Sequence, residues 1–109
     1  MTYKIFGILK RPDGMTFEQF KKWWVEDHVP RVMKWPNIVA YEINFPLNEN
    51  EQFDGVAAVS FKSREDAERI FQMPEGRSAR SAAIAETSRN VIFVAEEVVI
   101  VPRPPSHRG

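Results

Sequence analysis

The sequence has no cysteine, which excludes disulfide bridges, thiolate metal sites and a cysteine nucleophile. Histidine is nearly as scarce, because His107 lies close to the C-terminus and His28 is the one histidine in the body of the chain. A single histidine with scattered carboxylates is not a metal-ligand set, so we predict no metal site. Glycine motifs for nucleotide binding and a serine–histidine–aspartate spacing are also absent, which predicts a protein without a cofactor.

The sequence also lacks an excess of either charge and a long apolar run. The 15 basic residues balance the 15 acidic ones and form no basic stripe, so nucleic acid is not an expected partner. No apolar run reaches the roughly 20 residues that a membrane-spanning helix needs. The first ten residues lack the charged and small-residue features of a secretion signal. We therefore predict a cytoplasmic protein that does not enter a membrane.

The chain does contain enough apolar material for one folded domain. Of its 109 residues, 43% are hydrophobic, which argues against disorder. A domain of this size buries roughly 65% of the surface of its extended chain, which is enough for a core without cross-links. We predict one domain over residues 1–102, followed by a proline-rich tail, 103–109, that is extended or disordered.

Residues 16–36 are predicted to form a long amphipathic helix, and it is the most informative stretch of the sequence. Thr16 followed by Gln19 makes a capping-box pattern at its start. Aromatic residues and a histidine then recur at spacings of three, four and four, which places them on one helix face: Phe17, Phe20, Trp24 and His28. The apolar face of such a helix packs on the core, so we expect His28 to be buried beside apolar surface.

Pro30 distinguishes His28 from an ordinary core residue. The proline removes the backbone hydrogen bond to the carbonyl of Glu26, and its ring crowds that carbonyl. The helix is therefore expected to kink or end within one turn of His28. Two interpretations of the imidazole stay open: a buried neutral side chain satisfied by a backbone group, or a general acid or base acting on a small molecule.

The remaining patterns predict strands over 2–10, 38–45, 53–62 and 91–101, and helices over 63–73 and 77–89 separated by a break at 74–76. This order predicts an α+β, ferredoxin-like βαββαβ fold with a four-stranded antiparallel sheet and helices on one face. The third strand is slim at Gly55, Ala57 and Ala58, which leaves room above the sheet for a close-packed helix or a ligand.

The first and last predicted strands are apolar on both faces, whereas a sheet covered by helices on one side needs only one apolar face. The chain has no element left to cover the second face. The simplest cover is a second copy of the same sheet, so we predict a homodimer with two-fold symmetry.

Several polar residues outside the first helix are candidate ligand contacts. Tyr41 is either a hydrogen-bond donor to a ligand or a packing residue, and Asn44 is a strand residue able to orient a ligand. Arg77 is either a partner for a carboxylate or phenolate, or a solvated surface charge. Glu96 and Glu97 are adjacent and point to opposite faces of an apolar strand. We expect at least one of them to be enclosed with a raised pKa, paired across a dimer interface, or placed where the strand frays.

Several segments together form a recognisable pattern: KRPDGMTFEQFKKWWVEDHVP at 10–30, Tyr41 with Asn44, FDGVAAVSF at 53–61, MPEGRSA at 73–79 and FVAEE at 93–97. This pattern resembles the EthD family of the dimeric α/β-barrel superfamily, over nearly the whole chain. The resemblance implies a homodimer with a pocket between the sheet and the helices of each subunit. His28, the histidine of the His-x-Pro motif, would point into that pocket. Relatives often carry an acidic residue around the position of Ala58, and Glu96 or Glu97 would have to replace it here.

The resemblance does not fix a reaction, because proteins of this superfamily share a shape and differ in chemistry. Its members include an ether-degradation accessory protein, methylmuconolactone isomerase, polyketide cyclases, decarboxylases and quinone-forming monooxygenases. We predict a cofactor-independent enzyme that acts on a small cyclic, aromatic or lactone-like metabolite by proton transfer through His28, as an isomerase, lyase, cyclase or decarboxylase. Phe20 and Trp24 would form an apolar wall, and Tyr41 would orient an oxygen. The alternatives are a non-catalytic accessory or ligand-binding protein and a cofactor-free monooxygenase acting on a phenol.

Overall fold

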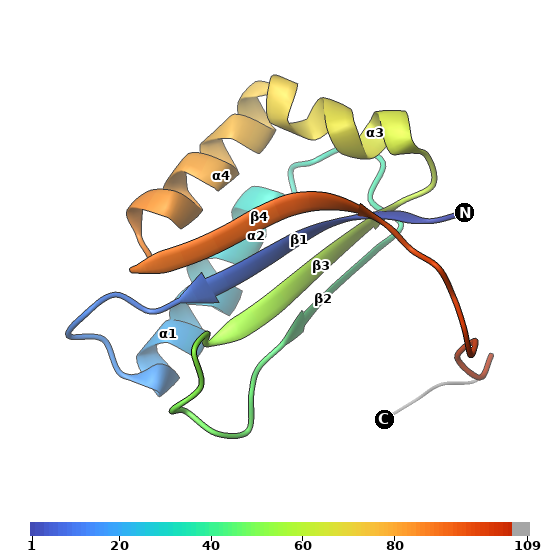
Figure 1. Ribbon diagram of the computed structural model, residues 1–109. Coiled ribbons are helices and arrows are strands. Elements are labelled where there is room, and N and C mark those ends of the chain that lie inside the picture. The colour runs from blue at the N-terminus through green and yellow to red at the C-terminus, as the bar shows by residue number, and fades with distance from the viewer. Residues whose placement is uncertain (106–109) are drawn as a thin grey trace.

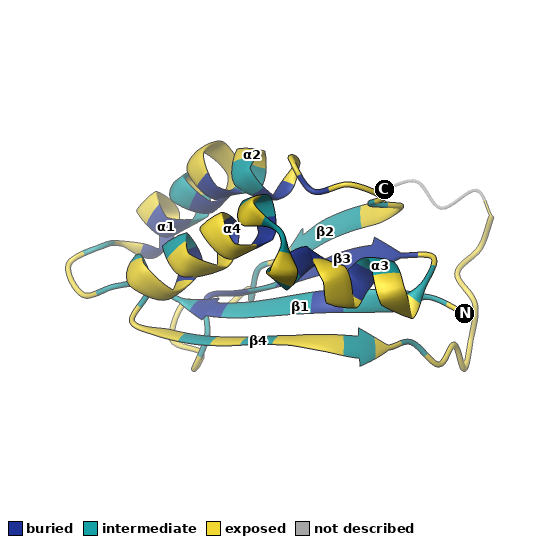
Figure 2. Cartoon of the chain, turned by 90° about the horizontal axis from the view of Figure 1, so that it is seen from above, coloured by how far each residue is buried: buried dark blue, intermediate teal, exposed yellow. Residues whose placement is uncertain are grey.

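Four strands form one antiparallel sheet, and the helices lie on one of its faces (Figure 1, Figure 2). The strands β1 (Tyr3–Lys10), β2 (Ala40–Asn44), β3 (Gly55–Phe61) and β4 (Arg89–Glu96) are arranged in the order β2-β3-β1-β4. The helices are α1 (Phe17–Trp23), α2 (Val29–Val32), α3 (Arg64–Arg69) and α4 (Pro74–Ala85). This architecture confirms the predicted α+β ferredoxin-like fold.

The computed structural model describes residues 1–105. Residues 106–109, which hold His107 and most of the predicted tail, lie outside the described residues. No helix among the described residues has both the length and the apolar character that crossing a bilayer requires.

The predicted helix over 16–36 is divided at the expected place. The capping box is present, since Thr16 Oγ1 accepts from the backbone N–H of Gln19 and the Gln19 side chain accepts from that of Thr16. After α1 the backbone widens into a π-helical turn, Trp24–His28, in which the Val29 N–H donates to the Trp24 carbonyl. Pro30, in the first turn of α2, has no N–H to continue the α-helical pattern. The helix thus continues through His28 in a widened turn and ends at Val32, about one turn later.

The strand register assigns each side chain to one of two faces. Ile5 pairs with Val59 and Val94, and these residues face the helices. One residue further along β1, Phe6 pairs with Ala58 and Phe93, which therefore point to the opposite face.

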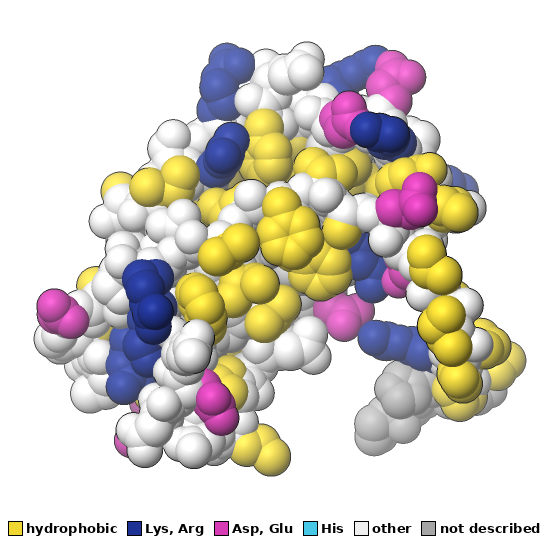
Figure 3. Space-filling model, viewed as in Figure 1, with side chains coloured by type: hydrophobic (Ala, Val, Ile, Leu, Met, Phe, Trp, Pro, Cys, Tyr) yellow, Lys and Arg dark blue, Asp and Glu magenta, His cyan; other side chains and the backbone are white. Residues whose placement is uncertain are grey.

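The face turned away from the helices, called the outer face below, is apolar as predicted. Phe6 and Phe93 stack there with ring centroids 5.5 Å apart. Val91 shares this face through its pairing with Ile8 and is exposed, like Phe93. Figure 3 shows hydrophobic side chains gathered on this side of the molecule. No element among residues 1–105 covers the outer face.

Gly55 shows how the slim third strand is used. A Cβ atom at this position would lie 2.5 Å from Cζ3 of Trp24. The helical residues 17–32, which comprise α1, the π-helical turn and α2, are called the first helical segment. The missing side chain at Gly55 lets Trp24, the largest buried ring of this segment, rest directly on the sheet. By contrast, a Cβ added at Gly7, on the neighbouring strand, would meet nothing within 4 Å, because Gly7 lines open space.

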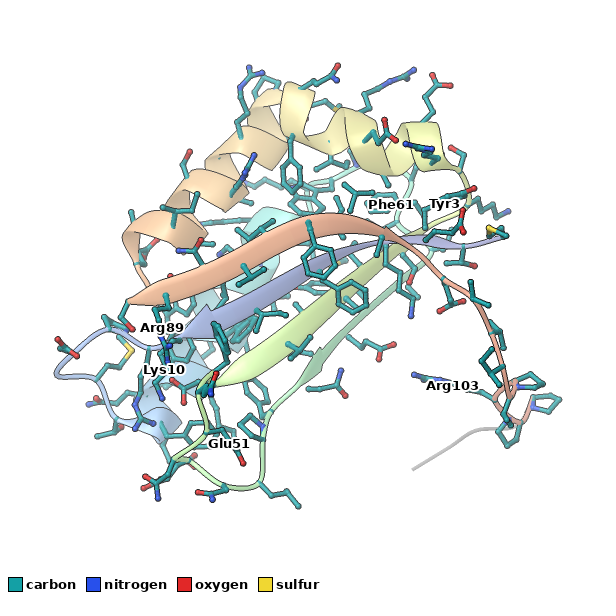
Figure 4. The ribbon with its side chains drawn as sticks, in the orientation of Figure 1. Tyr3, Lys10, Glu51, Phe61, Arg89 and Arg103 are labelled. Atoms are coloured by element: carbon teal, nitrogen blue, oxygen red, sulfur yellow. The ribbon has the colours of Figure 1, made fainter. Side chains whose placement is uncertain are left out.

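Both ends of the last helix and of the last strand were predicted wrongly, since the helix ends at Ala85 instead of residue 89 and the strand begins at Arg89 instead of residue 91. The last helix begins at Pro74 rather than at residue 77, because proline is well tolerated in the first turn of a helix, where its N–H would have no partner. The last strand ends at Glu96 rather than at residue 101. Residues 98–101 instead form an apolar arm that leaves the sheet, with relative exposures from 58% to 84%. Arg103, beyond the arm, lies 3.4 Å from the carboxylate of Glu42 (Figure 4).

Candidate functional site

The π-helical turn begins at Trp24 and ends at His28, and it turns both side chains into the protein interior. Both are buried, with relative exposures of 1% and 6%. Trp23 stacks on the imidazole of His28 with centroids 5.2 Å apart, and on the other side it stacks on Phe20 at 5.1 Å. Single π-helical turns recur at functional sites, where they re-aim side chains that a regular helix would point elsewhere. Here the turn carries the histidine that the sequence singled out.

His28 lies at the edge of a cavity between the sheet and the helices. The cavity is open to solvent, and its enclosed free volume is small, about 40 Å³. Its walls are mostly apolar. They come from the four strands, from the first helical segment and from α4. The lining includes Gly7, Trp24, His28, Tyr41, Phe71 and Arg80.

Three buried polar atoms in this lining have no hydrogen-bond partner among the described residues: Trp24 Nε1, His28 Nδ1 and Tyr41 Oη. Leaving such a group unpaired costs about 1–3 kcal/mol. Native proteins rarely keep several of them in one place without a bound molecule or water to satisfy them. The cavity therefore presents an apolar surface with a small group of polar atoms, which is the usual composition of a ligand site.

The imidazole of His28 is neutral at pH 7. Burial, and next the positive charge of Arg31, lower its pKa from 6.5 to about 4, while the carboxylate of Glu86 acts in the opposite direction. A neutral imidazole carries one donor and one acceptor nitrogen. His28 is thus able to accept a proton or a hydrogen bond at one nitrogen.

Tyr41 stays protonated over the physiological range. Burial raises the pKa of its phenol to about 12, and the nearby indole N–H of Trp24 opposes part of this increase. The contact between the two groups does not reach normal hydrogen-bond geometry, since both atoms remain without a partner. Tyr41 is therefore a hydrogen-bond donor within the cavity.

Glu86, which the sequence did not single out, is the carboxylate that acts on His28. It accepts hydrogen bonds from Trp23 Nε1 and from Arg31 Nη1, each at 3.1 Å. These bonds tie the end of α4 to the first helical segment and hold Trp23 against the imidazole. Glu86 lies 58 positions from His28 in the sequence, so no local pattern could have revealed it.

The structure brings together only part of the predicted site. Trp24, His28 and Tyr41 line the cavity. Phe20 is fully buried and touches Trp24, so it supports the wall from behind. Asn44 pairs with Val56 and points to the outer face, away from the cavity.

The predicted contacts in the second half of the chain also lie elsewhere. Arg77 is exposed and donates to the carbonyl of Gln72 at 2.7 Å. Glu96 is exposed at the end of β4, and Glu97 pairs with Lys4 at 2.7 Å, so neither carboxylate is enclosed at the cavity. Ala58 faces outward, so a carboxylate there would not reach His28 in the same subunit.

A second buried carboxylate, Asp54, has a structural role at one end of the sheet. Its side chain accepts from the backbone N–H of Arg11 at 2.8 Å and lies 3.5 Å from Lys10 Nζ. Lys10 also donates to the carbonyl of Glu51, and Figure 4 shows both residues close to Arg89 at this end. Asp54 does not line the cavity, and residues 1–105 contain no group of three potential metal ligands.

Comparisons with known proteins agree with this architecture. A family model described as the EthD domain matches residues 12–87. None of the curated proteins matches the sequence. An ethyl tert-butyl ether d (EthD) family protein from Bacillus halodurans C-125 has a similar structure, with a TM-score of 0.77 and 15% identity over 90% of this chain and 100% of that chain.

Two further solved structures share the fold. A hydroxynitrile lyase from Passiflora edulis has a TM-score of 0.71 and 11% identity, over 93% of this chain and 97% of that chain. A dimeric protein with a ferredoxin-like fold from Bacteroides fragilis NCTC 9343 has a TM-score of 0.61 and 17% identity, over 88% and 96%. The EthD domain model matches more than half of the length of this chain, so the chain belongs to the EthD family.

Proposed function

We propose that the cavity binds a small cyclic metabolite, aromatic or lactone-like, and that His28 moves a proton on it without a cofactor. The observation that carries this proposal is the unpartnered Nδ1 of His28, in the same cavity as the unpartnered donors of Tyr41 and Trp24. A bound molecule would satisfy these atoms, and a base with a free nitrogen among hydrogen-bond donors is the arrangement that proton transfer requires.

The chemistry follows from the protonation states. With the imidazole proton on Nε2, Nδ1 takes a proton from an acidic position of the substrate, and the imidazolium then returns it to another atom of the molecule or to a leaving group. The Tyr41 hydroxyl donates to the substrate oxygen on which negative charge develops, because its phenol keeps its proton at neutral pH. Trp24 supplies a flat apolar wall and a second donor.

The low pKa of His28 sets a condition on this mechanism. A base with a pKa of about 4 removes protons poorly from weak acids at pH 7. It becomes a stronger base when a bound molecule brings negative charge near the ring, since an opposite charge favours the imidazolium. Glu86 already acts in this direction. The substrate is therefore expected to assist its own deprotonation.

Turnover assays on a panel of phenols, muconolactones and aromatic acids test the proposal. Replacing His28 with Gln keeps a polar side chain but removes the base, and we expect a loss of roughly 10²–10⁴-fold in rate. His107→Gln, the other histidine of the chain, is the matched control and should leave turnover unchanged. Equal turnover by wild type and His28→Gln would refute the catalytic role.

A non-catalytic accessory or ligand-binding protein is the second candidate. The observation in its favour is that no carboxylate lines the cavity among the described residues, so no acidic side chain in the wall shares proton transfer with His28. Ring compounds that bind wild type tightly and are never converted would support this candidate. The hydroxynitrile lyase among the fold neighbours is a catalyst, so the same fold supports enzymes as well. A cofactor-free monooxygenase acting on a phenol remains a prediction from the sequence.

We also propose that the protein is a homodimer joined through the outer faces of its sheets. The Phe6–Phe93 stack, in which Phe93 is exposed, and the apolar arm, 98–101, need a cover that residues 1–105 do not supply. The arm and the sheet enclose a groove at the edge of the outer face, where a second copy would fit. The dimeric description of the Bacteroides fragilis neighbour supports this assembly.

Sedimentation at micromolar concentration tests the dimer. We expect wild type to sediment as a dimer and Phe93→Glu, which places a charge in the centre of the stack, to sediment as a monomer. Ile84→Glu is the control, because Ile84 is about as exposed as Phe93 but lies on α4. A monomeric wild type would contradict the proposal.

A further inference from the structure

We propose that the cavity selects compounds that carry a negative charge, such as ring carboxylates or phenolates, and that Arg80 of α4 holds this charge. This inference rests on the proposed function, because it concerns the substrate class of the same cavity. Arg80 was not among the residues that the sequence singled out.

The side chains that line the cavity carry charge of one sign only. Among the described residues that line it, Arg80 is the one with a full charge, because His28 and Tyr41 are neutral at pH 7. No aspartate or glutamate lines the cavity. A bound anion would therefore meet a positive charge and no repelling carboxylate in the cavity wall.

Arg80 is also held in place without being neutralised. Its guanidinium lies over the ring of Phe71, 5.0 Å from the centroid, and Phe71 lines the cavity as well. Within residues 1–105, Arg80 has no salt bridge and no hydrogen bond, whereas Arg64 and Arg69 each pair with a glutamate. A guanidinium that stacks on a ring keeps its donors free for a carboxylate, which it binds with two parallel N–H groups.

The buried donors point to the same kind of ligand. The Tyr41 hydroxyl and the Trp24 indole are both donors without a partner inside the cavity. A ligand that satisfies them must offer acceptor oxygens. A carboxylate or a phenolate is rich in acceptors, and its apolar ring matches the remaining wall. Charge, acceptor atoms and an apolar ring thus define one class of compound.

Arg77 provides a matched control, because it lies one helical turn before Arg80 on the same helix. It carries the same charge and is also exposed, but it does not line the cavity and donates to the carbonyl of Gln72. Replacing either arginine with glutamine removes one positive charge from α4. Only the replacement at position 80 removes it from the cavity wall.

The test compares benzoate with benzamide, which have nearly the same shape and differ in charge at pH 7. Dissociation constants are measured by calorimetry, with circular dichroism to verify folding. We expect wild type to bind benzoate more tightly than benzamide. Arg80→Gln should weaken benzoate binding by about fivefold, the effect of a partly exposed ion pair, and leave benzamide binding unchanged. Arg80→Lys should keep most of the preference for benzoate, and Arg77→Gln should keep all of it.

Three outcomes would overturn the inference: equal binding of both compounds by wild type, an equal loss for both in Arg80→Gln, or the same loss in Arg77→Gln. If benzamide still binds wild type and its binding is weakened by His28→Gln, the cavity remains the binding site and only the charge selection fails. If neither compound binds wild type, the inference and the proposed binding of ring compounds fail together.

Discussion

Burial of a neutral His28 makes the stability of the protein depend on pH in a defined window. The imidazole has a pKa of about 4 in the folded protein and 6.5 in the unfolded chain. Between these values the unfolded chain binds more protons, so the free energy of unfolding falls as the pH is lowered from 6.5 towards 4. Above pH 6.5 the contribution of His28 is fully present.

The size of the effect follows from the difference between the two pKa values, which is worth ~3 kcal/mol. The side chain is almost fully buried, so solvent screening reduces this value little. Such a loss is a large part of the stability of a small domain, which is usually about 5–15 kcal/mol.

Urea unfolding at pH values from 4 to 7 measures this loss, at constant protein concentration because an oligomer would couple stability to concentration. Wild type is compared with His28→Gln, so that contributions from carboxylates common to both proteins cancel. We expect wild type to lose ~3 kcal/mol more than the variant between pH 7 and pH 4. Parallel curves for the two proteins would refute the conclusion that His28 is buried in its neutral form.

Other substitutions test the surroundings of the cavity. Arg31→Gln removes a positive charge near the imidazole, so the pKa of His28 should rise, as followed by its NMR titration; an unchanged or lower pKa would contradict the assignment. Gly55→Ala should lower stability by about 1–3 kcal/mol in urea unfolding, because its Cβ would overlap the Trp24 ring. Gly7→Ala meets open space and should change stability by less than about 0.5 kcal/mol, while it reduces the binding of ring compounds; equal costs at the two glycines would contradict the packing described here.

The local features of the first helical segment could be predicted from the sequence because they depend on near neighbours. The capping box needs only Thr16 and Gln19, and the shared face of Trp24 and His28 needs only their spacing. Pro30 predicted a break in the helix, although not that the break would be a π-helical turn. The order of strands and helices was sufficient for the fold, since few arrangements satisfy it.

The rest of the site depends on contacts between distant parts of the chain. Glu86 reaches Arg31 and Trp23 only because α4 packs beside α2, and nothing near Glu86 in the sequence indicates this. Whether Arg77 or Arg80 lines the cavity depends on the rotation of α4 about its axis. This helix is rich in small residues and only weakly amphipathic, so its sequence does not define the buried face well.

The choice of Asn44 as a ligand contact failed for a different reason. Alternation predicts that Tyr41 and Asn44 point to opposite sides of β2, but the resemblance to a family placed them in one group. The structure follows the alternation. Glu97 lies just beyond β4, which ends earlier than its apolar sequence indicated, and it pairs with Lys4.

An NMR titration with ring compounds tests the central claim most directly, namely that the cavity beside His28 is the ligand site. We expect at least one phenol, lactone or aromatic acid to shift the imidazole signals of His28 and the indole N–H signal of Trp24, whose nitrogens lack partners in the cavity. These shifts should be absent with a neutral compound that has no ring, such as ethanol. Binding that perturbs residues of the outer face and leaves both signals unchanged would contradict the account.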